Sequence, residues 1–187
     1  QRTWPVHEAG PEVLVNAVLT ATAAQPGQTV LDLYAGASLY SRFLAEAVGS
    51  YGSVVAVEPG PVASLDAKFN LQGVAQATVV HKDVNRALDD WLGIPADSLL
   101  TGGFSGGPVD TVVLNAPPQG AKSATLGRID RVQPNKIVYV SSHTPSLARD
   151  TRWLEKHGWT LDSVDAYDLA PNTQQMHAVC VFTKPSV

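Results

Sequence analysis

The 187-residue sequence predicts a single α/β domain built on a mostly parallel sheet, with helices on both faces. Three observations lead to this fold class. Short apolar runs alternate with segments of helical periodicity along most of the chain. One of these runs, 30–33, leads directly into a glycine turn and a helix. The chain closes on two β-rich runs with no helix-length segment between them, which predicts an antiparallel terminal strand.

The N-terminal segment, residues 1–27, is predicted to hold an entry helix. Apolar residues recur at helical spacing over about 9–24, and the pattern stops at the breaker sequence Gln25-Pro26-Gly27. Residues 28–187 are then expected to form the sheet core, so that the whole chain is one domain.

Seven strands and five further helices are expected in the sheet core. The predicted strands are short and rich in β-branched and other apolar residues: 29–33, 53–57, 77–80, 110–114, 136–140, 159–168 and 177–183. The predicted helices repeat apolar residues every three or four positions and end near Gly, Pro or Asn: 39–48, 61–71, 84–92, 121–131 and 145–157. The glycine-rich segment 102–108 is predicted to be a surface loop inside the domain.

The amino-acid composition limits the classes of protein to which the chain can belong. A hydrophobic content of 44% is enough for a core that needs no disulfide, and the single cysteine, Cys180, suits a reducing cytosol. No apolar run approaches roughly 20 residues, so we expect a soluble, cytoplasmic protein without a membrane partner. The net charge of −4 gives no basis for tight nucleic-acid binding by the whole surface. The chain starts at Gln1, and we expect it to be a piece of a longer protein whose other parts bind RNA.

A nucleotide-type cofactor site is predicted where the first strands of the core end. The turn after 30–33 keeps one glycine, Gly36, and lacks the further glycines that cradle a dinucleotide pyrophosphate. S-adenosylmethionine has no phosphate and fits such a turn. Asp32, Glu58 and Asp83 follow or end three successive strands, at the edge where open sheets bind ligands. We expect Glu58 to bind the ribose, Asp83 the adenine edge and Asp32 the methionine portion.

Three sequence motifs carry a resemblance to the RNA uracil-5 methyltransferase family. They are Asp32-Leu33-Tyr34-Ala35-Gly36, the segment 115–121 (Asn-Ala-Pro-Pro-Gln-Gly-Ala) and the segment 137–142 (Ile-Val-Tyr-Val-Ser-Ser). The resemblance extends to 147–150 and 173–177 and covers nearly the whole chain. It implies the class I methyltransferase fold, a Rossmann-like sheet of seven strands, with S-adenosylmethionine as cofactor and RNA as substrate. Tyr34 and Asn115 would then line the methyl-transfer site.

The same resemblance implies that two catalytic residues of the family are replaced. The family's nucleophilic cysteine corresponds to Ser142, and its basic glutamate corresponds to His177. Asn115 stands where the family has aspartate. Because the thiolate is the reactive form of cysteine and a serine hydroxyl needs an adjacent base, we expect no covalent cysteine mechanism here. Cys180 lies in an apolar run and is predicted to be a buried structural residue.

Other motifs in the chain are weaker. Segment 115–118 is similar to the Asn-Pro-Pro-aromatic motif of enzymes that methylate exocyclic amines, but Ala116 is inserted and no aromatic residue follows. Segment 103–107 matches the G-x-S-x-G nucleophile elbow without the strand and helix that this motif requires. The five histidines show no metal-ligand spacing, so we expect no metal site.

The sequence thus predicts an S-adenosylmethionine-dependent methyltransferase related to RNA uracil-5 methyltransferases. Its expected cofactor residues are Asp32, Tyr34, Gly36, Glu58, Asp83 and Asn115, and its expected catalytic positions are Asn115, Ser142 and His177. The alternative is a catalytically inactive module that kept the fold and binds S-adenosylmethionine or RNA.

Overall fold

One eight-stranded sheet organises the computed structural model, which describes residues 6–8, 11–94, 106–169 and 176–185. The strands are β1 Val6–Glu8, β2 Thr29–Leu33, β3 Ser53–Val57, β4 Ala77–Val80, β5 Thr111–Asn115, β6 Lys136–Ser141, β7 Thr160–Asp168 and β8 Met176–Thr183. The helices are α1 Pro11–Thr22, α2 Leu39–Val48, α3 Pro61–Asn70, α4 Val84–Trp91, α5 Lys122–Val132 and α6 Thr144–Lys156. The strand order is β1-β7-β8-β6-β5-β2-β3-β4.

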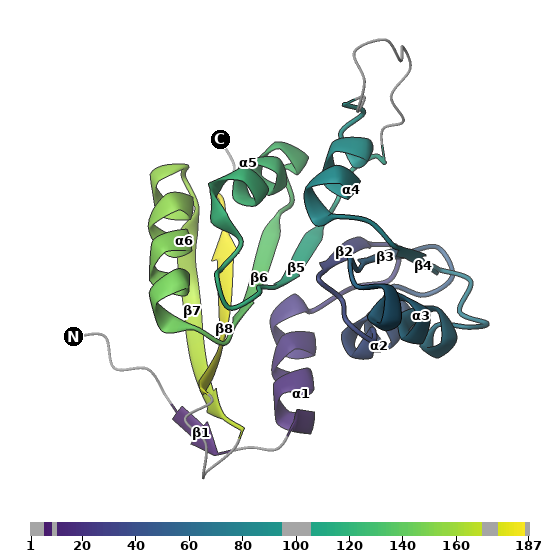
Figure 1. Ribbon diagram of the computed structural model, residues 1–187, viewed down its shortest axis with the longest axis horizontal. Helices are drawn as coiled ribbons and strands as arrows, with labels where there is room; N and C mark the ends of the chain where they lie inside the picture. The colour runs from purple at the N-terminus through teal and green to yellow at the C-terminus, as the bar shows by residue number, and fades with distance from the viewer. Residues whose placement is uncertain (1–5, 9–10, 95–105, 170–175, 186–187) are drawn as a thin grey trace.

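Helices cover both faces of the sheet (Figure 1), with α1 and α2 packed on one face and α4, α5 and α6 packed on the other. Side chains alternate along the buried strands, so that in β2 Val30 packs with α1 and α2, whereas Leu31 and Leu33 pack with α4 and α5. The same alternation separates Val138 from its neighbours Ile137 and Tyr139 in β6. Both faces are therefore apolar, and the strands have the near-continuous apolar sequences of a doubly covered parallel sheet.

The predicted fold class is confirmed. The described residues contain every predicted strand and helix, with ends that differ by at most two residues from the expected ones. β8 runs antiparallel to both β6 and β7, as the missing helix between the last two β-rich runs predicted.

Two parts of the prediction differ from the structure or fall outside it. Residues 1–27 were expected to contribute only a helix, yet the three-residue β1 pairs in parallel with the end of β7. Three residues at a sheet edge are too few to show a strand period, so β1 carried no sequence signal. Most of the predicted loop 102–108 lies outside the described residues.

The strand order changes direction between β2 and β5, where open sheets of this type bind ligands. From β2 the sheet continues through β3 to β4 on one side and through β5 to β6 on the other. The connections after β2 and β5 therefore leave in opposite directions, which is the topology at which open α/β sheets bind ligands beyond the carboxyl ends of their strands. Tyr34 follows β2 by one residue and Asn115 ends β5, one residue past the Leu33–Leu114 pair.

Candidate functional site

Asp32 is the most deeply buried acid of the described chain. It is 0% exposed near the end of β2, and its Oδ2 accepts a hydrogen bond of 2.6 Å from the Ser41 hydroxyl on α2. Its Oδ1 is buried and has no partner. Burial, together with the nearby Glu58 carboxylate, raises the pKa of Asp32 to about 7. An unpaired acceptor of this kind is the expected partner of a ligand's donor group.

Glu58 fixes the glycine turn from the end of β3. Its Oε1 accepts a hydrogen bond of 2.9 Å from the Gly36 amide, and its Oε2 accepts one of 2.6 Å from the Gly60 amide. A carboxylate has about four lone-pair sites, so each oxygen keeps capacity for one further donor. Glu58 can thus hold the turn and still bind a pair of ligand hydroxyls.

The turn between β2 and α2 alternates residues of left-handed conformation. Tyr34, Gly36 and Ser38 have φ angles of 56°, 59° and 65°. A Cβ atom added at Gly36 would meet no atom within 4 Å, so the backbone here borders open space. The Ser38 hydroxyl is buried without a partner. The turn therefore offers a close backbone approach and one unused polar group.

Asp83 and Tyr34 complete this side of the site. Asp83 begins α4 as its N-cap and accepts a hydrogen bond of 3.2 Å from the Arg86 amide, but the side chain is exposed and open to further donors. Burial, followed by the Asp83 and Glu58 carboxylates, raises the pKa of the Tyr34 hydroxyl. The structure thus brings together Asp32, Tyr34, Gly36, Glu58 and Asp83.

The predicted catalytic positions lie at the neighbouring ends of β5, β6 and β8. Ser142 and His177 each lie one residue beyond Ser141–Ala178, the last pair of the β6–β8 ladder. His177 lines a cavity of about 180 Å³ between β8 and the start of α6, whereas the exposed Ser142 and Asn115 are not among its lining residues. Asn115 is paired with Val140 on β6. The three positions occupy neighbouring strand ends, but only His177 reaches the cavity.

The two histidines near this cavity differ in chemistry. The His177 Nδ1 is buried without a partner, and burial lowers the pKa of this imidazole, which keeps it neutral at pH 7. His143 instead caps α6, because its Nδ1 lies 3.0 Å from the Ser146 hydroxyl and 3.3 Å from the Ser146 amide. Ser142 therefore does not have the adjacent His143 as a base. Cys180 is buried, as predicted, and this burial raises the pKa of its thiol to about 12.

A buried carboxylate that sequence reasoning did not single out joins the two substrate-side segments. Asp150 on α6 is 1% exposed, and its Oδ2 accepts hydrogen bonds from the Ala121 amide at 2.7 Å and the Tyr139 hydroxyl at 2.6 Å. Arg149 donates a 2.6 Å hydrogen bond to the Gln119 carbonyl. These contacts hold the segment after Asn115 against α6, which follows Ser142. The sequence signals were an aspartate within a predicted helix and the family resemblance over 147–150, and neither indicated this bridging role.

The described ranges hold neither a cluster of metal ligands nor a helix that could span a membrane. No group of three or more His, Cys, Asp or Glu side chains there is placed to hold a metal ion. In those same ranges, every helix is too short or too polar to cross a membrane.

Comparison with curated proteins relates the chain to RNA methyltransferases, although no protein-family model matches it. Similar proteins include an uncharacterized RNA methyltransferase of Streptomyces avermitilis, 29% identical over 178 residues, and a 23S rRNA (uracil(1939)-C(5))-methyltransferase of Alkalilimnicola ehrlichii, 32% identical over 176 residues. The alignments cover 95% and 91% of this chain but 38% and 36% of those proteins. The chain thus spans a little over a third of their length.

Solved structures give the fold. The tRNA (uracil-54, C5)-methyltransferase of Pyrococcus abyssi, solved with S-adenosyl-L-homocysteine, superposes with a TM-score of 0.70 at 22% identity, over 96% of this chain and 40% of that one. Precorrin-6y C5,15-methyltransferase from Geobacter metallireducens gives 0.70 at 17% identity, over 96% and 93%. The fold is that of class I methyltransferases, as predicted.

Proposed function

We propose that this chain, a homologue of RNA uracil-5 methyltransferases, is the domain that binds S-adenosylmethionine and transfers its methyl group to RNA. The unpaired oxygen of Asp32 carries the proposal, because it lies buried beside Glu58 at the switch point of a class I fold. Relatives named as RNA methyltransferases, including a uracil-C5 enzyme, support the choice of RNA as substrate.

The residues present fit this cofactor. Glu58 would accept hydrogen bonds from the two ribose hydroxyls while it holds Gly36. Asp32 would accept one from the ammonium of the methionine portion, and Asp83 one from the amino edge of the adenine. When bound, S-adenosylmethionine supplies an electrophilic methyl group on a positively charged sulfonium. The acidic groups at this edge favour such a cation, and binding of the cation would stabilise the ionised form of Asp32.

At the substrate side, Tyr34 and Asn115 would line the transfer site, and Ser142 and His177 would occupy the former nucleophile and base positions. A serine hydroxyl without an adjacent base does not attack uracil as a thiolate does. We therefore favour transfer to a nitrogen or oxygen that is already nucleophilic, which needs mainly proximity and orientation. His177, neutral at pH 7 and unpaired at Nδ1, is suited to accept the proton that this atom loses.

Calorimetric titration with S-adenosylmethionine tests cofactor binding. We expect Glu58→Gln to weaken binding about 10- to 100-fold, because one charge-assisted hydrogen bond is worth about 1.5–3 kcal/mol. Glu46→Ala, which removes an exposed carboxylate from α2, is the matched control and should bind as the wild type does. Equal affinity of the Glu58→Gln and wild-type proteins, or no binding at all, would contradict the proposed site.

A second candidate is a binding module that does not catalyse methyl transfer. The exposed Ser142, which lies outside the cavity that His177 lines, favours it. Incubation of the protein with S-adenosylmethionine carrying a labelled methyl group and with bulk RNA separates the two. Label in RNA supports the enzyme, whereas cofactor binding without label supports the module.

Reversion of the two replaced residues tests whether the family chemistry still fits this site. With S-adenosylmethionine supplied, the Ser142→Cys/His177→Glu variant should form a covalent adduct with RNA that contains 5-fluorouridine, since carbon 5 would then carry fluorine in place of the proton that must be removed to release the enzyme. The wild type should form none. Mass spectrometry of the protein–RNA product measures the adduct, and an adduct in the wild type would show that Ser142 is itself a working nucleophile.

A further inference from the structure

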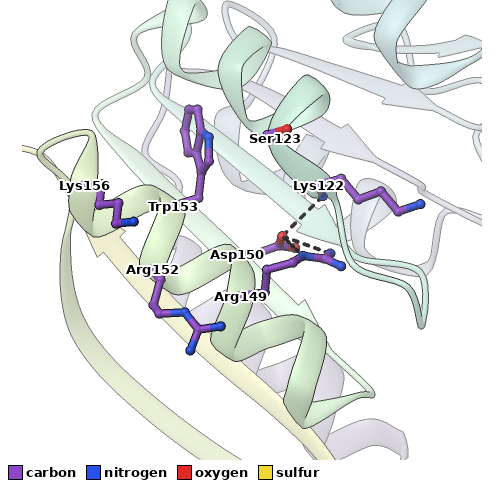
Figure 2. Close-up of a pocket in the computed structure, with 7 residues that line it drawn as sticks. All are labelled: Lys122, Ser123, Arg149, Asp150, Arg152, Trp153 and Lys156. Carbon is purple, nitrogen blue, oxygen red and sulfur yellow. Dashed lines mark hydrogen bonds and ion pairs between the residues drawn. The ribbon is translucent and has the colours of Figure 1, made fainter.

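A cationic groove lies between α5 and α6, apart from the cofactor residues. Its lining consists of Lys122, Ser123, Arg149, Asp150, Arg152, Trp153 and Lys156, and its volume is about 430 Å³ (Figure 2). Four of the 13 lysines and arginines of an acidic chain therefore gather in one groove, with a single carboxylate among them. We refer to it as the α5–α6 groove.

Three of the four cations lack an ion-pair partner among the described residues. Arg149 is paired with the buried Asp150 and donates to the Gln119 carbonyl. Lys122, Arg152 and Lys156 are exposed and form no ion pair with a described carboxylate. No carboxylate of the described residues forms an ion pair with these charges, so they are available to an anionic partner.

The cations follow a line and do not converge on one point. Arg149, Arg152 and Lys156 are spaced by three and four residues along α6, so they share one face of the helix. In Figure 2 their charged ends and that of Lys122 are spread around Asp150 and Trp153. A small anion would need convergent donors, whereas a polyanion with regularly spaced charges fits a spread-out row.

Trp153 adds an aromatic surface to the same groove. It is half-buried beside α5, where a Cβ atom at Gly127 would lie 3.8 Å from Trp153 Cζ2, and its ring stacks on His157 with a centroid separation of 3.6 Å. Aromatic rings interleaved with cations are the usual elements of single-stranded nucleic-acid grooves, since bases stack while phosphates meet Lys and Arg. An acidic protein segment would use the cations alone.

The groove is connected to the substrate side of the site. Lys122 follows the segment 115–121, and the Arg149 guanidinium contacts the Gln119 carbonyl within it. α6 itself begins two residues after Ser142. A strand lying in the groove would therefore continue toward Asn115, Ser142 and His177.

We infer that the α5–α6 groove binds the sugar–phosphate backbone of the substrate RNA next to the methylated nucleotide. The inference rests on the proposed function, which it extends by assigning a binding surface for RNA to this domain. Phosphates lie against Lys122, Arg152 and Lys156, and a base stacks on Trp153.

Fluorescence anisotropy with a short, labelled single-stranded RNA of mixed sequence tests this surface. The Arg152→Glu/Lys156→Glu variant of the full chain should bind about tenfold or more weakly than the wild type. The slope of log affinity against log salt should fall by about 1.4, which is about 0.7 for each of two lost phosphate contacts. The matched control is Arg42→Glu/Lys68→Glu, which makes the same charge change on exposed positions of α2 and α3 and should lose much less.

Three further measurements make the result specific. The Arg152→Ala/Lys156→Ala pair repeats the test if the charge reversal does not fold, as judged by circular dichroism. RNA that contains 4-thiouridine should cross-link to the peptide that includes Trp153. Equal losses in the groove and control variants, no binding of RNA by the wild type at low salt, or tighter groove-dependent binding of polyglutamate would each overturn the inference.

Titration of the same variants with S-adenosylmethionine separates this inference from the proposed function. The groove variants should retain the wild-type affinity for the cofactor. If the groove variants bound both RNA and the cofactor as the wild type does, the RNA-binding role of the groove would be refuted and the proposed function would stand. Groove-dependent RNA binding in a protein that never binds the cofactor would refute the methyltransferase assignment and leave the groove in place.

Discussion

At the scale of single residues, the burial of Asp32 costs folding free energy and leaves one carboxyl oxygen that a ligand could bind. Its carboxyl group is completely buried, with one oxygen bound to Ser41 and the other unpaired. Because burial disfavours the charged form, the folded protein holds the Asp32 proton up to about pH 7, whereas the unfolded chain loses it near pH 3.8. A bound cation beside Oδ1 would offset that cost.

Asp32 should make the protein less stable as the pH rises. The folded state binds one more proton than the unfolded state between about pH 4 and pH 7, so the free energy of unfolding falls through this window and then levels off. From pH 5 to pH 8 the loss due to Asp32 is about 3 kcal/mol. In urea denaturation, the free energy of unfolding of Asp32→Asn should fall by this much less than that of the wild type between pH 5 and pH 8. An identical pH dependence in both proteins would mean that Asp32 ionises normally in the fold.

At the scale of elements, the contacts of Asp150 hold α6, β6 and the segment before α5 in one arrangement. Its Oδ2 accepts hydrogen bonds from the Ala121 amide and the Tyr139 hydroxyl. Gly120, with a φ of +82°, passes so close that a Cβ atom there would lie 2.7 Å from the same oxygen. The packing of backbone against carboxylate therefore fixes the path of the chain after Asn115.

Removal of this carboxylate should destabilise the domain strongly. We expect Asp150→Ala to lower the free energy of unfolding by about 3 kcal/mol or more, because it leaves buried donors unpaired. Tyr139→Phe should cost about 1–2 kcal/mol, and the double variant less than the sum, since both residues share one hydrogen bond. Asp66→Ala on the exposed face of α3 is the control and should stay within about 0.5 kcal/mol. If urea denaturation gave Asp150→Ala the same free energy of unfolding as this control, the Asp150 carboxylate would not stabilise the fold.

The elements were largely predictable from the sequence because burial on both faces of the sheet leaves continuous apolar runs, as in Ile137–Val140. β1 could not be predicted, since its pairing with β7 depends on the sheet edge and not on its own three residues. The acids of the cofactor side were found because each one follows or ends a strand. Asp150 was missed because its partners, Ala121 and Tyr139, come together only in the folded chain.

At the scale of the whole molecule, opposite charges are separated in space. Asp32, Glu58 and Asp83 lie at the ends of β2, β3 and the segment after β4, whereas the α5–α6 groove collects cations on the helices that follow β5 and β6. The net charge of −4 hides this division. One edge of the sheet thus suits a cationic cofactor and one helical face suits a polyanion, a distribution that is consistent with the proposed methyl transfer to RNA.

Ligand binding at the switch point should stabilise the entire domain, because β2 and β5 lie in the centre of the sheet. A ligand at 100 times its Kd adds about 2.7 kcal/mol, which corresponds to a rise in Tm of about 5–10 °C for a domain of this size. S-adenosylhomocysteine, which cannot donate a methyl group, is the suitable ligand. Thermal melts should show this rise in the wild type and a much smaller one in Glu58→Gln. The same rise in both would place the ligand elsewhere.

The short pairing of β1 with β7 has a consequence for self-association. β1 covers only Ala166–Asp168, so in the described part of the chain the outer edge of β7 from Thr160 to Asp165 has no neighbouring strand. An open strand edge is a template to which another copy can add. Asp162, which is exposed on β7, places a negative charge on this edge strand, and two such strands would repel each other. We therefore expect this charge to disfavour edge-to-edge pairing where β1 does not reach.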